Sequence, residues 1–282
     1  MNAIGIILRL TLREAARRKV LWGLVLLTLV FLAFYALGLN FVHGQILRAI
    51  GLGRGPRLFS LNDVWNFWLT ATLYAANFLI VMLTVLISVD AVAGEISSGT
   101  IHAIATKPLR RSDILLGKWL GFAVILGVYI TVLIGGTFLI TTIITGYAAR
   151  NFGEGLGLMF LEALVLLSVS FLGGTRLPTL ANGVLGFGLF GLAFIGGWMQ
   201  LIGGFPGFES DAAVKLGQLT SLIMPSEALW RYALSQVSSG ANPFSLMFNA
   251  TTLPDVDVVP YAIVFALVVL ILAVVSFQRR DL

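Results

Sequence analysis

The 282-residue sequence has no cysteine and few charged residues, which make up only 11% of the chain. The lack of cysteine excludes disulfides, thiolate metal sites and cysteine nucleophiles. A soluble domain carries about 25% charged residues, most of them on its surface. Because 58% of the residues are hydrophobic and the mean hydropathy is +0.97, a soluble globular enzyme is excluded. The composition predicts an integral membrane protein.

Motifs for common catalytic chemistries are also missing. Gly117-Lys118 does not belong to a nucleotide-binding loop, because Ser112 stands where that motif needs glycine and Trp119 where it needs serine or threonine. The histidines His43 and His102 fall on opposite sides of the predicted membrane, so they cannot share a metal ion. We expect no catalytic residue, no metal ligand and no cofactor in this chain.

Six apolar runs are long enough to cross a bilayer, which requires about 20 residues. They cover residues 20–39, 67–89, 119–145, 156–174, 180–203 and 258–277. Gly173, Gly174 and Pro178 crowd the junction of the fourth and fifth runs, so five spans are the alternative. The sequence therefore predicts an all-α membrane protein with one transmembrane domain over residues 1–282.

The distribution of basic residues predicts the orientation of the chain. Twelve of the 18 lysines and arginines fall on the side of the membrane that would carry both termini. Cytoplasmic segments are enriched in these residues near the ends of spans. We expect both termini in the cytoplasm, in a multi-pass protein of the inner or plasma membrane.

Residues 1–19 have the pattern of an amphipathic helix. Ile4, Leu8, Leu12 and Ala15 recur at helical spacing on one face, and arginines line another. We expect this helix to lie at the cytoplasmic membrane surface with its apolar face down. The alternative is a solvated basic leader.

Residues 93–111 belong to the cytoplasmic segment that joins the second and third spans. Glu95 is expected near the start of a short helix, where a carboxylate suits the helix dipole. Lys107-Pro108 would end that helix, because the residue before proline avoids the α region. Ser112 would then cap the helix that continues into the third span. On these grounds alone an ordinary charged loop is equally expected.

Glu162 is the one acid well inside a predicted span. A charge at the bilayer centre costs about 2.5–3.5 kcal/mol, so such residues face a cavity or a partner. We interpret Glu162 as a candidate substrate, ion or proton contact in the transport path. The alternative is that Glu162 sits in the outer leaflet near Arg150, or is protonated.

The longer outer segment covers residues 206–257. A helical pattern follows Pro225, with Ser226 as the expected N-cap and an apolar face further along the helix. Residues on that face are Leu229, Ala233, Leu234 and Val237. We expect re-entrant or surface helices on the outer leaflet.

Four short motifs lie between the second and third spans, namely Gly94-Glu95, Gly99-Thr100, Lys107-Pro108 with Arg110, and Leu116-Gly117-Lys118. Through these motifs the chain resembles the permease subunits of type-2 ATP-binding-cassette (ABC) transporters, especially the branch that includes NosY-like permeases. The basic leader resembles the elbow helix of that family, and residues 277–282 resemble its C-terminal end. Glu162 and the long segment 206–257 depart from the family pattern.

The resemblance implies a six-span exporter permease with an elbow helix and a cytoplasmic coupling helix. It assigns coupling to the ATPase to Glu95, Gly99, Thr100, Lys107, Pro108, Arg110, Arg111 and Lys118. It also implies a second permease, in a homodimer or heterodimer, and two copies of a separate ATPase that binds ATP and Mg. The first, second and fifth spans would line the path. Lipid and an extracytoplasmic partner at residues 206–257 are further expected contacts, and nucleic acid is not.

Two other functions stay open at this point. One is a secondary transporter or channel driven by an ion gradient through Glu162, which would call for more intramembrane charges or broken helices. The other is a relay that passes ATPase motion to an extracytoplasmic partner through residues 206–257 without transport. No residue selects a substrate.

Overall fold

The computed structural model describes residues 3–17, 19–53, 60–97, 110–204, 207, 209–238 and 257–280. This part of the chain is helical and contains no strand. Six of its helices are long and apolar enough to cross a membrane: α2 (Lys19–Gly51), α3 (Leu61–Ser97), α5 (Arg111–Thr145), α6 (Phe152–Gly174), α7 (Thr179–Gly203) and α11 (Val258–Gln278). Three shorter helices are α1 (Ala3–Arg17), α8 (Asp211–Ile223) and α9 (Ser226–Val237).

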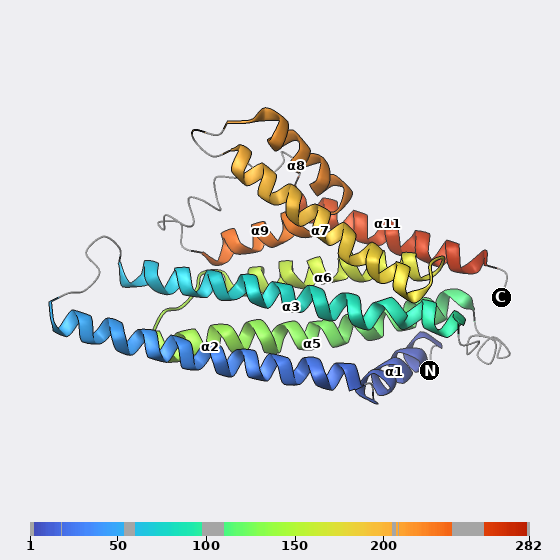
Figure 1. Ribbon diagram of the computed structural model, residues 1–282. Coiled ribbons are helices and arrows are strands. Elements are labelled where there is room, and N and C mark those ends of the chain that lie inside the picture. Colours follow the sequence, from blue (N-terminus) through green and yellow to red (C-terminus); the bar gives the residue numbers. More distant parts are fainter. Residues whose placement is uncertain are drawn as a thin grey trace.

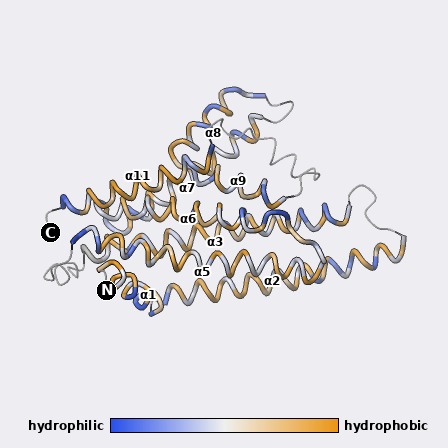
Figure 2. Tube along the Cα trace, turned by 180° about the vertical axis from the view of Figure 1, so that it is seen from behind, coloured by the Kyte–Doolittle hydropathy of each residue, from blue (hydrophilic) through white to orange (hydrophobic). Residues whose placement is uncertain are grey.

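The long helices form an elongated bundle with both chain termini at the same end (Figure 1). We call this the terminal end and the opposite one the far end. Hydrophobic residues run along the long helices, and most hydrophilic residues gather toward the ends (Figure 2). This distribution is what a bilayer requires of a bundle that crosses it.

The fourth and fifth spans are separate helices, so the alternative of five spans is wrong. The α6 helix ends at Gly174, and the amides of Arg176 and Leu177 close the turn by donating to the carbonyl of Gly173 at 3.0 and 2.8 Å. The extended backbone of Pro178, with φ −66° and ψ 159°, then precedes α7. Pro178 thus starts a new helix and does not kink a single long one.

Three helices extend well beyond the apolar runs that predicted them. The α2, α3 and α5 helices have 33, 37 and 35 residues. At about 1.5 Å per residue they exceed a hydrocarbon core of about 30 Å and continue beyond it. Glu95 lies in the last turn of α3 and not near the start of a short helix, so that expectation is wrong. Ser112 lies inside the first turn of α5, whose N-cap is Arg110.

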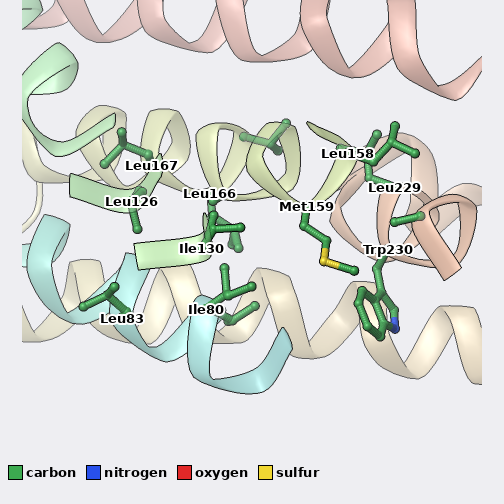
Figure 3. Packing of buried hydrophobic residues seen from close by; sticks show 14 of the residues in the cluster. Ile80, Leu83, Leu126, Ile130, Leu158, Met159, Leu166, Leu167, Leu229 and Trp230 are labelled. Atoms are coloured by element: carbon green, nitrogen blue, oxygen red, sulfur yellow. The ribbon is translucent and has the colours of Figure 1, made fainter. Parts of the chain in front are cut away.

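The α6 helix lies at the centre of the core, between α3, α5 and α9. Figure 3 shows apolar side chains from all four helices pointing toward one another. They are Ile80 and Leu83 from α3, Leu126 and Ile130 from α5, Leu158, Met159, Leu166 and Leu167 from α6, and Leu229 and Trp230 from α9. The shorter α9 therefore belongs to the core and is not a surface helix.

The α1 helix packs directly against α5 (Figure 1). A Cβ atom on Gly117 would lie 2.7 Å from Cβ of Ile7, and one on Gly121 would lie 2.8 Å from Cβ of Thr11. The pair of glycines thus permits this close approach. The buried side chains of α1 are Ile7, Thr11 and Ala15. The buried face of the helix is therefore rotated by part of a turn from the predicted one. The expected residues Ile4, Leu8 and Leu12 flank it, half-buried.

The α8 and α9 helices form a hairpin that enters the bundle from the far end. The α8 helix runs back along α7, where Gly196 faces Thr220 and Gly203 faces Ala213. The α9 helix returns along α6, where Gly155 faces Val237. The predicted helix after Pro225 is confirmed, with its expected apolar face buried. Its N-cap is Pro225 and not Ser226, whose hydroxyl has no hydrogen-bond partner.

Candidate functional site

The structure describes only some of the predicted coupling residues. Gly99, Thr100, Lys107 and Pro108 lie outside the described residues, as does the side chain of Glu95. Arg110 is exposed immediately before α5. Coupling through these residues therefore stays a prediction.

Arg111 joins the start of α5 to the end of the chain. Its Nη1 donates to the carbonyl oxygen of Gln278 at 3.3 Å and to that of Arg280 at 2.7 Å. Arg280 in turn donates to the carbonyl of Thr175, just after α6. Charge-assisted bonds of this kind are stronger than neutral ones. They hold α5, α6 and α11 together where the predicted ATPase would bind.

Lys118 is buried and does not lie on an exposed docking surface. Its Nζ donates to the carbonyl oxygen of Ala91 in α3 at 3.1 Å. One residue away, Asp90 accepts from the hydroxyl of Thr179 at 3.2 Å. The end of α3 is thus attached to both α5 and α7. A displacement of α3 would be passed to two other spans.

Asn182 adds a polar contact at the same level, which sequence reasoning missed. Its Nδ2 donates to the carbonyls of Val89 in α3 at 3.2 Å and Ser170 in α6 at 2.9 Å. Gly173 makes room for it, since a Cβ there would lie 2.2 Å from Oδ1 of Asn182. The sequence signal that could have identified Asn182 is a single asparagine within an apolar run.

A second group of polar residues lies inside the bundle, away from the terminal end. We call it the polar cluster, and it consists of Asn77 of α3, Glu162 of α6, Gln200 of α7, and Glu227 and Arg231 of α9. The exposed fractions of Glu162, Glu227 and Arg231 are 0%, 3% and 6%. Hydrogen bonds join Asn77 to Glu162 and Gln200 to Arg231, and Glu227 interacts electrostatically with both Glu162 and Arg231, so four helices meet at one buried polar site.

The predicted path residue Glu162 is bonded to α3. Its Oε1 accepts from Nδ2 of Asn77 at 3.3 Å, whereas its Oε2 has no hydrogen-bond partner. Oδ1 of Asn77 also has no partner. Glu162 is thus enclosed by protein, and its role in a substrate, ion or proton path stays a prediction.

Glu227 and Arg231 are four residues apart, so they share one face of α9. Nη2 of Arg231 donates to Oε1 of Gln200 at 2.8 Å. Gly197 makes room for the acid, because a Cβ there would lie 2.4 Å from Cγ of Glu227. The α9 helix is not one of the six spans. Burial raises the pKa of the Glu227 carboxyl, and the nearby Arg231 guanidinium opposes this rise.

An apolar groove of about 330 Å³ lies between α1, α2 and α5. Its polar members are Thr28 and Tyr129, whose hydroxyls are bonded to each other at 3.0 Å. The remaining lining, which includes Leu12, Leu24 and Val128, presents only hydrocarbon. Such a surface suits an acyl chain or another apolar ligand.

Metal chemistry finds no support in the described ranges. No three side chains among the histidines and acids there are grouped as a metal ion would require. The polar cluster also contains a guanidinium, which would repel a cation.

The sequence matches a family of known proteins over most of its length. A family model described as "ABC-2 family transporter protein" matches residues 6–282. A stretch of 60 residues is 43% identical to the probable ABC transporter permease protein NosY of Stutzerimonas stutzeri. That stretch covers 21% of this chain and 21% of the NosY protein, so it spans about a fifth of the relative's length.

Proposed function

Because this chain belongs to the ABC-2 transporter family, as a multi-pass membrane permease, we propose that it forms one half of an ATP-driven exporter. The observation that carries the proposal is the family match over residues 6–282, in a chain whose described part contains six helices able to cross a membrane. A second permease, identical or homologous, completes the path. The resemblance seen at residues 94–118 is confirmed at the level of the family.

ATP hydrolysis takes place on a separate ATPase, present in two copies, which binds ATP and Mg. The chain itself has no nucleotide-binding loop, since Ser112 and Trp119 replace the residues such a loop needs. The ATPase binds at the terminal end, which faces the cytoplasm. Support for this orientation comes from Arg17, Lys19 and Arg279, which are exposed at that end.

Coupling runs from the ATPase through residues 93–111 into α3 and α5. Lys118 and Asn182 bond the end of α3 to its neighbours, and Arg111 bonds the start of α5 to the chain end. A ligand changes a conformational equilibrium only if it contacts the two states differently. We therefore infer that ATPase closure repositions α3 and α5 together.

The second permease covers the outward faces of α7 and α8. These helices lean away from the rest of the bundle (Figure 1). Their large exposed hydrophobic residues include Leu180, Val184, Ile195, Leu219 and Ile223. A partner permease would bury this surface and place the α8–α9 hairpin at the extracytoplasmic mouth, where an extracytoplasmic partner can also bind.

The test is a pull-down of the tagged chain from its native membrane in gentle detergent, followed by mass spectrometry. We expect a stoichiometric soluble ATPase with the wild type. The double variant Glu95→Arg with Arg110→Glu should insert normally but lose the ATPase. The matched control Arg150→Glu, exposed at the far end, should retain it.

Other outcomes of the pull-down separate the alternatives. A homo-oligomer without ATPase overturns the proposal and favours a gradient-driven carrier that uses Glu162. An additional extracytoplasmic protein, together with the ATPase, supports the relay through residues 206–257.

A further inference from the structure

The polar cluster has one more acid than it has bases. Glu162 and Glu227 are carboxyls, Arg231 is a guanidinium, and Asn77 and Gln200 are neutral. In the described part of the chain, Tyr74 of α3 is the other titratable side chain that interacts electrostatically with Glu227 and Arg231. With both acids ionised, the cluster would hold a net negative charge inside the bundle.

A buried net charge is strongly unfavourable inside a membrane protein. Charges there are paired with one another or are neutralised by a proton. Arg231 can compensate one carboxylate but not two. One positive charge is therefore missing from the cluster.

The hydrogen bonds show a second, independent deficit. Three buried oxygens have no donor, and they are Oε2 of Glu162, Oε2 of Glu227 and Oδ1 of Asn77. One buried donor, Nε of Arg231, has no acceptor. Buried polar atoms without partners are rare, and each calls for an explanation. The cluster therefore lacks hydrogen-bond donors. A proton bound to one of the carboxyls would supply both a donor and the missing positive charge.

We propose that the polar cluster is a proton-binding site that Glu162 and Glu227 share. One proton from water binds the pair, which leaves one neutral carboxyl and one carboxylate compensated by Arg231. The proton resides mainly on Glu162, because the neighbour of Glu162 is the neutral Asn77, whereas Arg231 acts on Glu227. This inference requires the fold but not the ATPase.

The site lies between the hairpin and the spans, so proton binding is linked to hairpin position. Glu227 and Arg231 belong to α9, whereas Glu162, Asn77 and Gln200 belong to α6, α3 and α7. Withdrawal of α9 would hydrate both carboxyls and release the proton toward the far end. Protonation therefore favours the hairpin in its inserted position.

The experiment is infrared spectroscopy of the purified protein in an ester-free detergent at neutral pH. The carbonyl band of a protonated carboxyl is separate from carboxylate bands, and it shifts in D₂O. We expect this band in the wild type and its loss in both Glu162→Gln and Glu227→Gln, because either change leaves one carboxylate to balance the single charge of Arg231. Glu154→Gln, on the exposed first turn of α6, is the matched control and should keep the band.

Replacement of Arg231 should give a spectroscopic result that a misfolded protein could not produce. Arg231→Gln removes the compensating charge, so the band should about double, whereas unfolding would hydrate and ionise the acids. Arg231→Lys should keep the wild-type band. A wild type without the band, or a band that survives either Glu162→Gln or Glu227→Gln, overturns the shared site. The pull-down is independent, because a protonated pair can exist in a chain that binds no ATPase.

Discussion

Arg231 of α9 donates a hydrogen bond of 2.8 Å to Gln200 of α7, although the two residues belong to helices on opposite sides of α8 in the sequence. The bond attaches the second arm of the hairpin to a span. It is buried, and one of its partners is charged, so its loss would leave a guanidinium without an acceptor. The hairpin is thus fixed in the bundle by polar as well as apolar contacts.

Replacement of Gln200 tests this attachment. Gln200→Leu should lower the free energy of unfolding by about 1–3 kcal/mol, because it leaves a buried donor of Arg231 without its partner. Thermal unfolding in detergent measures the effect. Gln45→Leu, on an exposed position of α2, should leave the midpoint unchanged. Equal midpoints for the two variants would contradict the role of Gln200.

Gly197 tests the fit of α9 against α7. A methyl group there would lie 2.4 Å from Cγ of Glu227, so Gly197→Ala forces the hairpin to shift and should cost about 1–3 kcal/mol. Gly188→Ala on the same helix meets no atom within 4 Å and should be neutral or slightly stabilising. Thermal unfolding of the pair compares them directly. The prediction fails if Gly188→Ala is the more destabilising change.

The contact between α1 and α5 can be tested by labelling, because the chain has no native cysteine. Ile7→Cys places a thiol at a buried position against Gly117, and we expect slow reaction with maleimide. Adding Gly117→Leu should separate the helices and accelerate labelling at least severalfold. Gly135→Leu, elsewhere on α5 with no atom near its Cβ position, should have no effect. Rapid labelling of the Ile7→Cys chain alone would show that α1 is not docked.

Single cysteines also test the orientation of the chain. Arg17→Cys and Arg279→Cys, at the terminal end, should react with a membrane-impermeant reagent only after the cells are permeabilised. Arg48→Cys and Arg150→Cys, at the far end, should react in intact cells. All four positions are exposed, so the comparison depends on the side of the membrane and not on burial. The reverse pattern would place the ATPase-binding end outside and refute the proposed coupling.

The six helices were predictable because each contains an apolar run of the length that a bilayer requires. The full lengths of α2, α3 and α5 were not predictable, because hydropathy reports only the apolar stretch of each helix. The α3 helix continues past Asp90, so the charge of Asp90 does not mark the end of the helix. Its carboxylate accepts a hydrogen bond from the hydroxyl of Thr179 of α7. Local sequence contains no sign of that tertiary contact.

The polar cluster was predictable only at Glu162, where a single acid interrupts an apolar run. Its partner Asn77 is 85 residues away, and Gln200 and Arg231 are 31 residues apart. Glu227 and Arg231 seemed to be ordinary charges of an outer segment, because their spacing on α9 does not reveal what α9 packs against. Only the return of the hairpin along α6 brings these residues together.

The docking of α1 on Gly117 and Gly121 also determines which parts of the chain form one rigid unit. The backbones approach too closely for α1 to slide along α5 or separate from it without exposing Ile7 and Thr11. A tilt of α5 therefore carries α1 with it. Arg9, Arg13 and Arg17 lie on the exposed side of α1, so they would move with α5 as well. In the proposed transport cycle, each tilt of α5 would shift these three cations relative to the anionic headgroups of the cytoplasmic leaflet, and we expect the lipid composition of that leaflet to change the turnover rate.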